Sequence, residues 1–152
     1  MRRLAVKWGD YDDLSPLTGM HELTELWLGG ASGVRTLAPL AEMPQLRQLN
    51  VDSLRHAHDL SPLETLTLLR AVEIGGDWMS PRVVHVDSIA FLRNLPDLES
   101  LVLHTMIVDD LGYSPLLSLG SLREVRVMPA QGMRPSHDEL CAAIPALKFL
   151  TR

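Results

Sequence analysis

The sequence predicts an α/β solenoid with about six parallel strands on a concave face and short helices or turns on the convex side. Three observations lead to this fold class. A frame of apolar residues, written L-x-x-L-x-L, occurs six times in the 152 residues. The middle positions of successive frames are 22, 23, 23, 29 and 24 residues apart, which is the spacing of a repeated strand-and-helix unit. Helix-start phrases of the type D-L-S-P-L lie between the frames.

Each frame is expected to form one strand of a parallel sheet. The six frames are Met1/Leu4/Val6, Leu23/Leu26/Leu28, Leu46/Leu49/Val51, Leu69/Val72/Ile74, Leu98/Leu101/Leu103 and Leu122/Val125/Val127. Because successive side chains on a strand point to opposite faces, the apolar positions should face the interior and the positions between them should stand on an open face. The predicted open face consists of the triplets Arg3, Ala5, Lys7; Glu25, Trp27, Gly29; Gln48, Asn50, Asp52; Ala71, Glu73, Gly75; Ser100, Val102, His104; and Glu124, Arg126, Met128.

The helix-start phrase occurs at residues 13–17 and 59–63, and degenerate forms occur at 36–40, 87–92 and 113–117. We predict that Ser15, Ser61 and Ser114 cap short helices and that the proline after each takes the first helical position. Ser61 and Glu64 also have the spacing of a capping box. Each unit should therefore run from a strand through a loop and a short helix into the turn before the next strand.

One step between frames is longer than the others, the 29 residues from Val72 to Leu101. The surplus lies in residues 75–87, where two glycines and a Ser-Pro pair are typical of a loop. We predict an insertion on the rim of the concave face, a place where solenoids often carry binding residues.

The two ends of the chain differ from the middle. Residues 1–130 are predicted to form the array, and residues 131–152 a degenerate repeat or a C-terminal capping helix that begins with a capping box at Ser136 and Glu139. Nothing before the first frame covers the open end of the stack, although repeat arrays normally need a polar terminal unit. We therefore expect either the rest of a larger chain or a second subunit at this N-terminal edge.

Composition excludes several classes of partner. The net charge is −5 with no basic stripe, so neither nucleic acid nor an acidic membrane surface is expected as a partner. No apolar run is long enough for a membrane helix, and the N-terminus does not resemble a signal peptide. A single cysteine, Cys141, gives no internal disulfide framework and favours a cytoplasmic, reducing location.

With the frames laid out, the chain resembles the leucine-rich repeat proteins. The units DLSPLTGMHELTELWL and TLAPLAEMPQLRQLNV resemble the short bacterial type of repeat, including the leucine-rich repeat sensor regions of bacterial NACHT or STAND receptors, which are similar to NOD-like receptors. The resemblance covers about residues 1–130. It implies a non-enzymatic module that recognises a protein or peptide, as the sensor of a larger bacterial signalling or defence receptor.

The chain departs from these proteins at one turn position. The third residue after each frame is commonly asparagine in the family, and here it is Gly9, Ala31, Leu54, Asp77, Met106 or Ala130. Without the amide ladder, the turns are expected to be looser or to be satisfied by water.

No constellation of residues predicts catalysis, a metal or a cofactor. Ser100 and His104 share a strand face but lie about 13 Å apart on an extended chain, which is too far for a nucleophile and its base. His56 and His58 form the only histidine cluster, and a third ligand is not evident. Nucleotide-binding glycine motifs are absent from the sequence.

The predicted binding site is a set of side chains on the open face and in the 75–87 loop. Trp27 should stand on the open face and Trp78 in the loop, and exposed tryptophans are typical of interface hot spots. The surrounding patch is mildly acidic, so a partner offering lysine or arginine beside an apolar group is favoured. The candidate residues are Glu25, Trp27, Gln48, Asn50, Asp52, Glu73, Trp78, Arg82, Val102, His104 and Arg126.

Two functions in this class remain open, together with a third of another class. The first is the sensor region of a larger receptor, which the uncovered N-terminal edge favours. The second is a free-standing cytoplasmic adaptor that dimerises or binds a partner through that edge. The third, an enzyme that uses the concave face, lacks any supporting motif.

Overall fold

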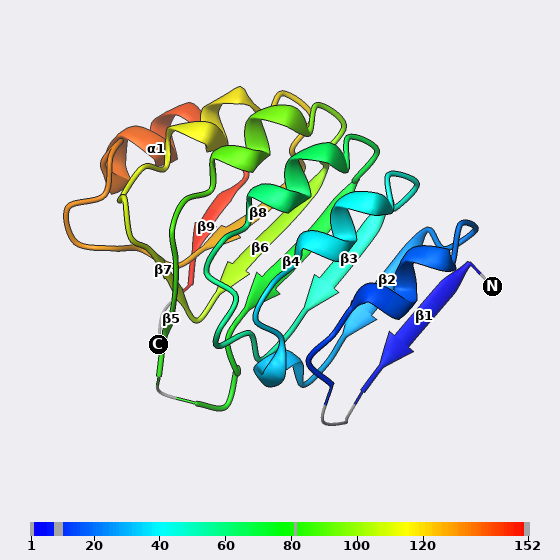
Figure 1. Ribbon diagram of the computed structural model, residues 1–152. Helices are drawn as coiled ribbons and strands as arrows, with labels where there is room; N and C mark the ends of the chain where they lie inside the picture. Colours follow the sequence, from blue (N-terminus) through cyan, green and yellow to red (C-terminus); the bar gives the residue numbers. More distant parts are fainter. Residues whose placement is uncertain (1, 8–10, 81, 151–152) are drawn as a thin grey trace.

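A seven-stranded parallel sheet forms one side of the molecule in the computed structural model, which describes residues 2–7, 11–80 and 82–150. The strands lie side by side in chain order, with β1 and β9 at opposite ends (Figure 1). They are β1 (Arg3–Val6), β2 (Glu25–Leu28), β3 (Gln48–Val51), β4 (Ala71–Gly75), β6 (Ser100–His104), β8 (Glu124–Val127) and β9 (Leu147–Phe149). The predicted α/β solenoid with parallel strands is confirmed.

The strand register follows the apolar frames of the sequence. The middle frame positions Leu4, Leu26, Leu49, Val72, Leu101 and Val125 pair directly with one another across the sheet. From β2 to β8 these residues are buried, while the residues between them are partly or fully exposed. The alternation therefore assigned the two faces of these strands correctly.

A seventh strand, which was not among the six predicted, follows the helix α1 (His137–Ala143). Ser136 caps this helix as predicted, since its hydroxyl accepts a hydrogen bond from the Glu139 amide at 3.3 Å. Ile144, Leu147 and Phe149 repeat the apolar frame, with Leu147 placed 22 residues after Val125. The strand β9 pairs in parallel with β8 and extends the sheet by one repeat.

The convex side is a row of short 3-10 helices, η1 and η3 to η6, that continues into α1 in Figure 1, while η2 is an additional turn directly after β2. Apolar side chains of these helices, such as Leu40, Leu63 and Leu92, are fully buried against the leucines of the strands. The helices are η1 (Ser15–Gly19), η2 (Ala31–Gly33), η3 (Ala38–Glu42), η4 (Ser61–Thr65), η5 (Ala90–Asn94) and η6 (Ser114–Ser118).

The predicted serine caps are wrong in their position. The N-cap residues of η1, η4 and η6 are Leu14, Leu60 and Tyr113, and none makes a side-chain cap hydrogen bond. Ser61 lies inside η4, so its capping box with Glu64 does not form. Leu14, Leu60 and Tyr113 are buried in the core instead, and in η1 and η4 the aspartate before the leucine contacts the helix start.

Asp13 and Asp59 provide that contact. Each places a carboxylate oxygen 2.9 Å from the backbone N–H of the serine two residues later, Ser15 or Ser61. Ser88 plays the same part in the phrase at 87–92, because its hydroxyl accepts from the Ala90 amide at 3.1 Å. In these helices the side chain that accepts the first helical N–H lies two residues before it, at Asp13, Asp59 or Ser88, and not at Ser15 or Ser61.

The turns after β2 and β3 are not loose, contrary to the expectation from the missing asparagines, while the turn position Gly9 lies outside the described residues. The amide of Ala31 donates to the Asp52 carbonyl at 2.9 Å, and the amide of Leu54 donates to the Gly75 carbonyl at 3.0 Å. Ala31, Leu54 and Met106 are also buried. Backbone bonds to the next repeat and apolar packing thus replace the asparagine amides at these positions.

The 75–87 segment was predicted to be a loop, but the structure shows a loop in only part of it. Its second part forms β5 (Val84–Val86), which pairs in parallel with β7 (Met106–Val108) in a separate two-stranded sheet. Val86, Met106 and Val108 are buried, so this sheet extends the core beyond the ends of β4 and β6. The first part of the segment is irregular and carries Trp78.

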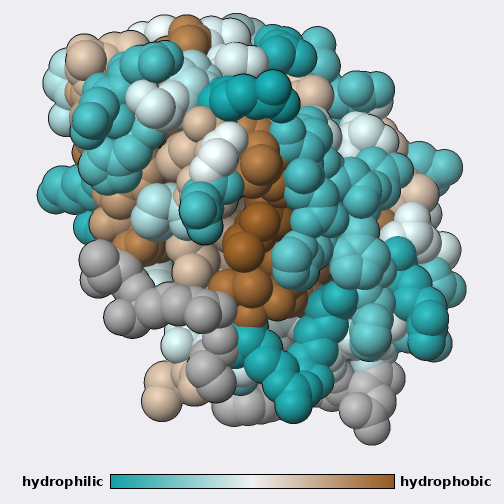
Figure 2. Space-filling model, turned by 90° about the vertical axis from the view of Figure 1, so that its left-hand side faces the viewer, coloured by the Kyte–Doolittle hydropathy of each residue, from teal (hydrophilic) through white to brown (hydrophobic). Residues whose placement is uncertain are grey.

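The core is a continuous leucine-rich layer between strands and helices. Figure 2 views the array from the side on which α1 lies in Figure 1, and hydrophobic residues form a hollowed band between hydrophilic ones there. Ile144 and Phe149 of the last repeat are partly buried against this core. Among the described residues, every helix is too short or too polar to cross a membrane.

Candidate functional site

The concave strand face is open, and Trp27 is its most prominent side chain. Trp27 is 56% exposed although it lies in the middle of a buried strand sequence, Leu26-Trp27-Leu28. The sheet register places it between Ala5 of β1 and Asn50 of β3. The prediction that Trp27 stands on the open face is therefore confirmed.

Two hollows lie side by side on this face, and we call them together the concave groove. The first, of about 200 Å³, contains Trp27, and the second, of about 280 Å³, contains Trp78. Gln48 and Asn50 line both hollows, which makes the groove continuous from β1 to β8. Eight of the candidate residues line it: Glu25, Trp27, Gln48, Asn50, Glu73, Trp78, Val102 and Arg126.

Several charges in the groove are already neutralised within the chain. At one end, Arg3 forms an ion pair with Glu25, and at the other, Arg126 lies 3.2 Å from Glu124. Both pairs are well exposed, so each contributes little to stability. Their effect on recognition is larger. Because the acids at both ends of the groove are paired with arginines, the acidic part of the groove is its centre.

Glu73 at that centre, and Asp52, which follows β3 and lines neither hollow, lack a cationic partner among the described residues. Burial, followed by the charge of Asp77, raises the pKa of Asp52. Burial, followed by the charge of Asp52, raises the pKa of Glu73, although hydrogen bonds from Asn50 and Trp78 act in the opposite direction. The Asn50 amide donates to Glu73 at 2.7 Å. A cation placed here would relieve both the repulsion and the lost hydration.

His104 is not on the open face, contrary to the prediction. Its side chain is 1% exposed, and the ring of Trp78 stacks on it with the ring centroids 3.8 Å apart and the planes inclined by 11°. Burial lowers the pKa of His104 to about 4. Trp78 itself remains 52% exposed, so the indole covers the histidine with one face and lines the groove.

Gly75 makes room for this stack, a role that the sequence analysis missed. A Cβ atom on Gly75 would lie 2.1 Å from the His104 carbonyl oxygen and 2.6 Å from Nδ1 of its ring. The two residues are direct neighbours in the pairing of β4 with β6. The glycine at the end of a frame was the available sign, since Gly29, directly after β2, is likewise in close contact with the backbone of Lys7. Gly29 and Gly75 are both buried, so these two predicted positions are not part of the open face.

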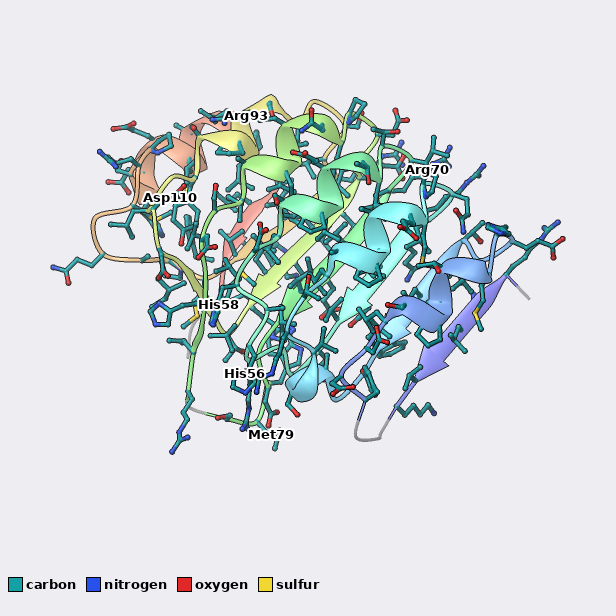
Figure 3. The ribbon with its side chains drawn as sticks, viewed as in Figure 1. His56, His58, Arg70, Met79, Arg93 and Asp110 are labelled. Atoms are coloured by element: carbon teal, nitrogen blue, oxygen red, sulfur yellow. The ribbon has the colours of Figure 1, made fainter. Side chains whose placement is uncertain are left out.

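Arg82 is separated from the groove, although the sequence placed it in the same patch. It lines a different hollow, between the 75–87 segment and residues 53–58, together with Arg55 and His58. His58 and Met79, labelled in Figure 3, lie at the same edge of the molecule, beyond the ends of the strands. Arg82 therefore belongs to a second surface.

The histidine cluster shows no metal-binding geometry. His58 hydrogen-bonds through Nδ1 to the backbone carbonyl of His85, and both His56 and His58 are exposed. The described part of the chain holds no group of three or more histidine, cysteine, aspartate or glutamate side chains that could ligate one ion.

The curved parallel sheet with one helical turn per repeat is the fold of the leucine-rich repeat proteins. Two solved structures of this class from Listeria monocytogenes are similar to the chain. An internalin (InlF) has 20% identity and a TM-score of 0.74 over 99% of this chain, and internalin C2 (InlC2) has 26% identity and a TM-score of 0.66 over 97%. The chain spans 40% of the first neighbour's length and 70% of the second's. No protein-family model and no curated protein matches the sequence.

Proposed function

We propose that this chain is a non-enzymatic recognition module that binds a protein or peptide in the concave groove. The observation that carries the proposal is the exposure of Trp27 on a sheet face whose neighbouring positions are mostly polar. A large aromatic ring in solvent has a free-energy cost that a partner removes on binding, which is why tryptophan is enriched in interface hot spots. The internalin-like fold supports the same class of function.

The groove favours an extended basic segment as its ligand. Trp27 and Trp78 offer apolar contacts, while Glu73 in the groove and Asp52 just after β3 offer negative charge that no cationic side chain of the described residues pairs with. A lysine or arginine side chain placed there gains both a carboxylate partner and an aromatic face. The ligand we propose therefore carries a basic residue beside an apolar one.

We further propose that the module is the ligand-sensing part of a larger bacterial receptor. The alternative is a free-standing cytoplasmic adaptor in which a second copy covers the outer edge of β1. Sedimentation of the protein over a hundredfold range of concentration separates the two, since only the adaptor becomes a dimer.

A peptide-display selection tests the proposed function. We expect the immobilised protein to select peptides with lysine or arginine next to an aromatic or branched apolar residue. Trp27→Ala should weaken binding of those peptides by about tenfold or more, because a central tryptophan contributes about 2 kcal/mol or more to such interfaces. Its unfolding free energy should change by less than about 0.5 kcal/mol, since the ring is mostly in solvent.

Leu117→Ala is the matched control for that experiment. Leu117 is 49% exposed like Trp27 but belongs to η6 on the convex side, so its removal should leave binding unchanged. Selected peptides that bind Trp27→Ala as well as wild type, or that lack basic residues, would contradict the proposed use of the concave groove.

A further inference from the structure

Two neighbouring segments of the chain, 53–58 and 76–87, are held together at both of their ends. At the first end, the amide of Ser53 donates to the Gly76 carbonyl at 3.3 Å. At the second end, the amide of Asp87 donates to the His58 carbonyl at 2.8 Å. The side chain of His58 adds a contact near the second end, from Nδ1 to the carbonyl oxygen of His85.

The two segments differ in length between these bonds. The chain takes five residue steps from Ser53 to His58 but eleven from Gly76 to Asp87. Since the ends are pinned, the longer segment has to bow away from the shorter one. The result is the hollow of about 200 Å³ lined by Arg55, His58, Asp77, Ser80, Arg82, Val83, Val84 and His85.

Two arginines face this hollow, one from each segment. Arg55 and Arg82 are exposed, and neither guanidinium forms an ion pair with an acid in the described ranges 2–7, 11–80 and 82–150. The only carboxylate in the lining is that of Asp77, which accepts the Met79 amide at 2.9 Å. The hollow is thus an electropositive place on a chain with a net charge of −5.

The histidines of the lining are oriented by acceptors on their own side of the fold. Nδ1 of His58 contacts the His85 carbonyl oxygen, and Nδ1 of His85 lies 2.6 Å from a carboxylate oxygen of Asp109. Both contacts require a proton on Nδ1, because a carbonyl and a carboxylate only accept.

We propose that this hollow binds a phosphate group. Two guanidinium groups on opposite walls match the oxygens of a tetrahedral dianion, with which arginine forms paired, charge-assisted hydrogen bonds. The site is separate from the concave groove, and it does not depend on the proposed function. The phosphate can come from a phosphorylated side chain of a partner protein or from free inorganic phosphate.

Phosphorus NMR with inorganic phosphate, and fluorescence polarisation with a labelled phosphoserine peptide, test the proposal. We expect saturable binding of the phosphopeptide and none of the same peptide with serine. Arg55→Gln and Arg82→Gln should each weaken binding by about tenfold, the effect of one charged hydrogen-bond pair. The matched control is Arg70→Gln, because Arg70 is exposed at the opposite edge of the molecule (Figure 3).

The results distinguish the source of the phosphate. Tighter binding of the phosphopeptide than of inorganic phosphate identifies a phosphorylated partner, and equal binding identifies the free ion. The proposal is overturned if neither probe binds, or if Arg70→Gln weakens binding as much as the two substitutions in the hollow. Circular dichroism of each variant verifies that a loss of binding is not a loss of fold.

Discussion

The buried histidine His104 makes the stability of this protein depend on pH in a defined direction. Its pKa is about 4 in the folded chain, against about 6.5 for an unperturbed histidine. Between these values the unfolded chain binds the proton and the folded chain does not. The free energy of unfolding therefore falls as the pH is lowered from 6.5 to 4, and the full contribution is present above pH 6.5.

The size of this effect follows from the difference between the two pKa values. Each pKa unit corresponds to about 1.4 kcal/mol, so the loss across the whole range is about 3 kcal/mol. That is a large share of the stability of a typical domain. Asp52 and Glu73 change the free energy of unfolding in the opposite direction on acidification, because their pKa values are raised in the folded chain. Comparing wild type with a variant at His104 cancels their contribution, since both proteins contain them.

Urea unfolding of wild type and His104→Phe at a series of pH values from 7.5 to 4 measures the effect. Phenylalanine keeps an aromatic ring against Trp78 but cannot titrate. On acidification, the free energy of unfolding of this variant should therefore fall by about 3 kcal/mol less than that of wild type. His56→Gln, at an exposed histidine, should follow the wild-type curve. Parallel curves for wild type and His104→Phe would refute the assignment of a buried, neutral His104.

Two further predictions concern the repeats. Leu49→Ala should lower the free energy of unfolding by about 2–5 kcal/mol, because Leu49 is fully enclosed in a central repeat. Leu4→Ala, on the partly buried end strand, should lower it less. Equal losses of the two variants in chemical denaturation would contradict the register. Gly75→Ala should lower the free energy of unfolding by about 1–3 kcal/mol, since the added Cβ meets the His104 carbonyl oxygen. Gly19→Ala should change the melting temperature little, because nothing lies within 4 Å of the added Cβ. Equal melting temperatures of the two variants would show that the backbone at Gly75 moves to make room for the Cβ.

The parallel sheet could be predicted from the sequence because the same apolar frame recurs in each repeat. A frame such as Leu46/Leu49/Val51 fixes a strand, its buried face and its register against the next frame. Residues 131–152 were predicted as a degenerate repeat or a capping helix, but the frame Ile144, Leu147 and Phe149 was not predicted as a strand, since a proline interrupts it and a phenylalanine ends it. Its spacing from Val125 was nevertheless the correct sign.

The candidate site was predictable only where it depends on strand alternation. Alternation placed Trp27, Asn50 and Glu73 on the open face correctly. It failed for His104, because Trp78 from the inserted segment folds over the end of β6. That contact joins residues 26 positions apart, and no local pattern encodes it. Arg82 was misplaced for the same reason, since the path of the insertion decides which surface it reaches.

The central claim is that the concave groove, and not the helical convex side, contacts the ligand. NMR mapping with a display-selected basic peptide on isotope-labelled protein tests it most directly. We expect the indole signal of Trp27, assigned from Trp27→Ala, to shift together with amides of β2, β3 and β4. Shifts confined to the convex helices η3 to η6 would contradict the claim.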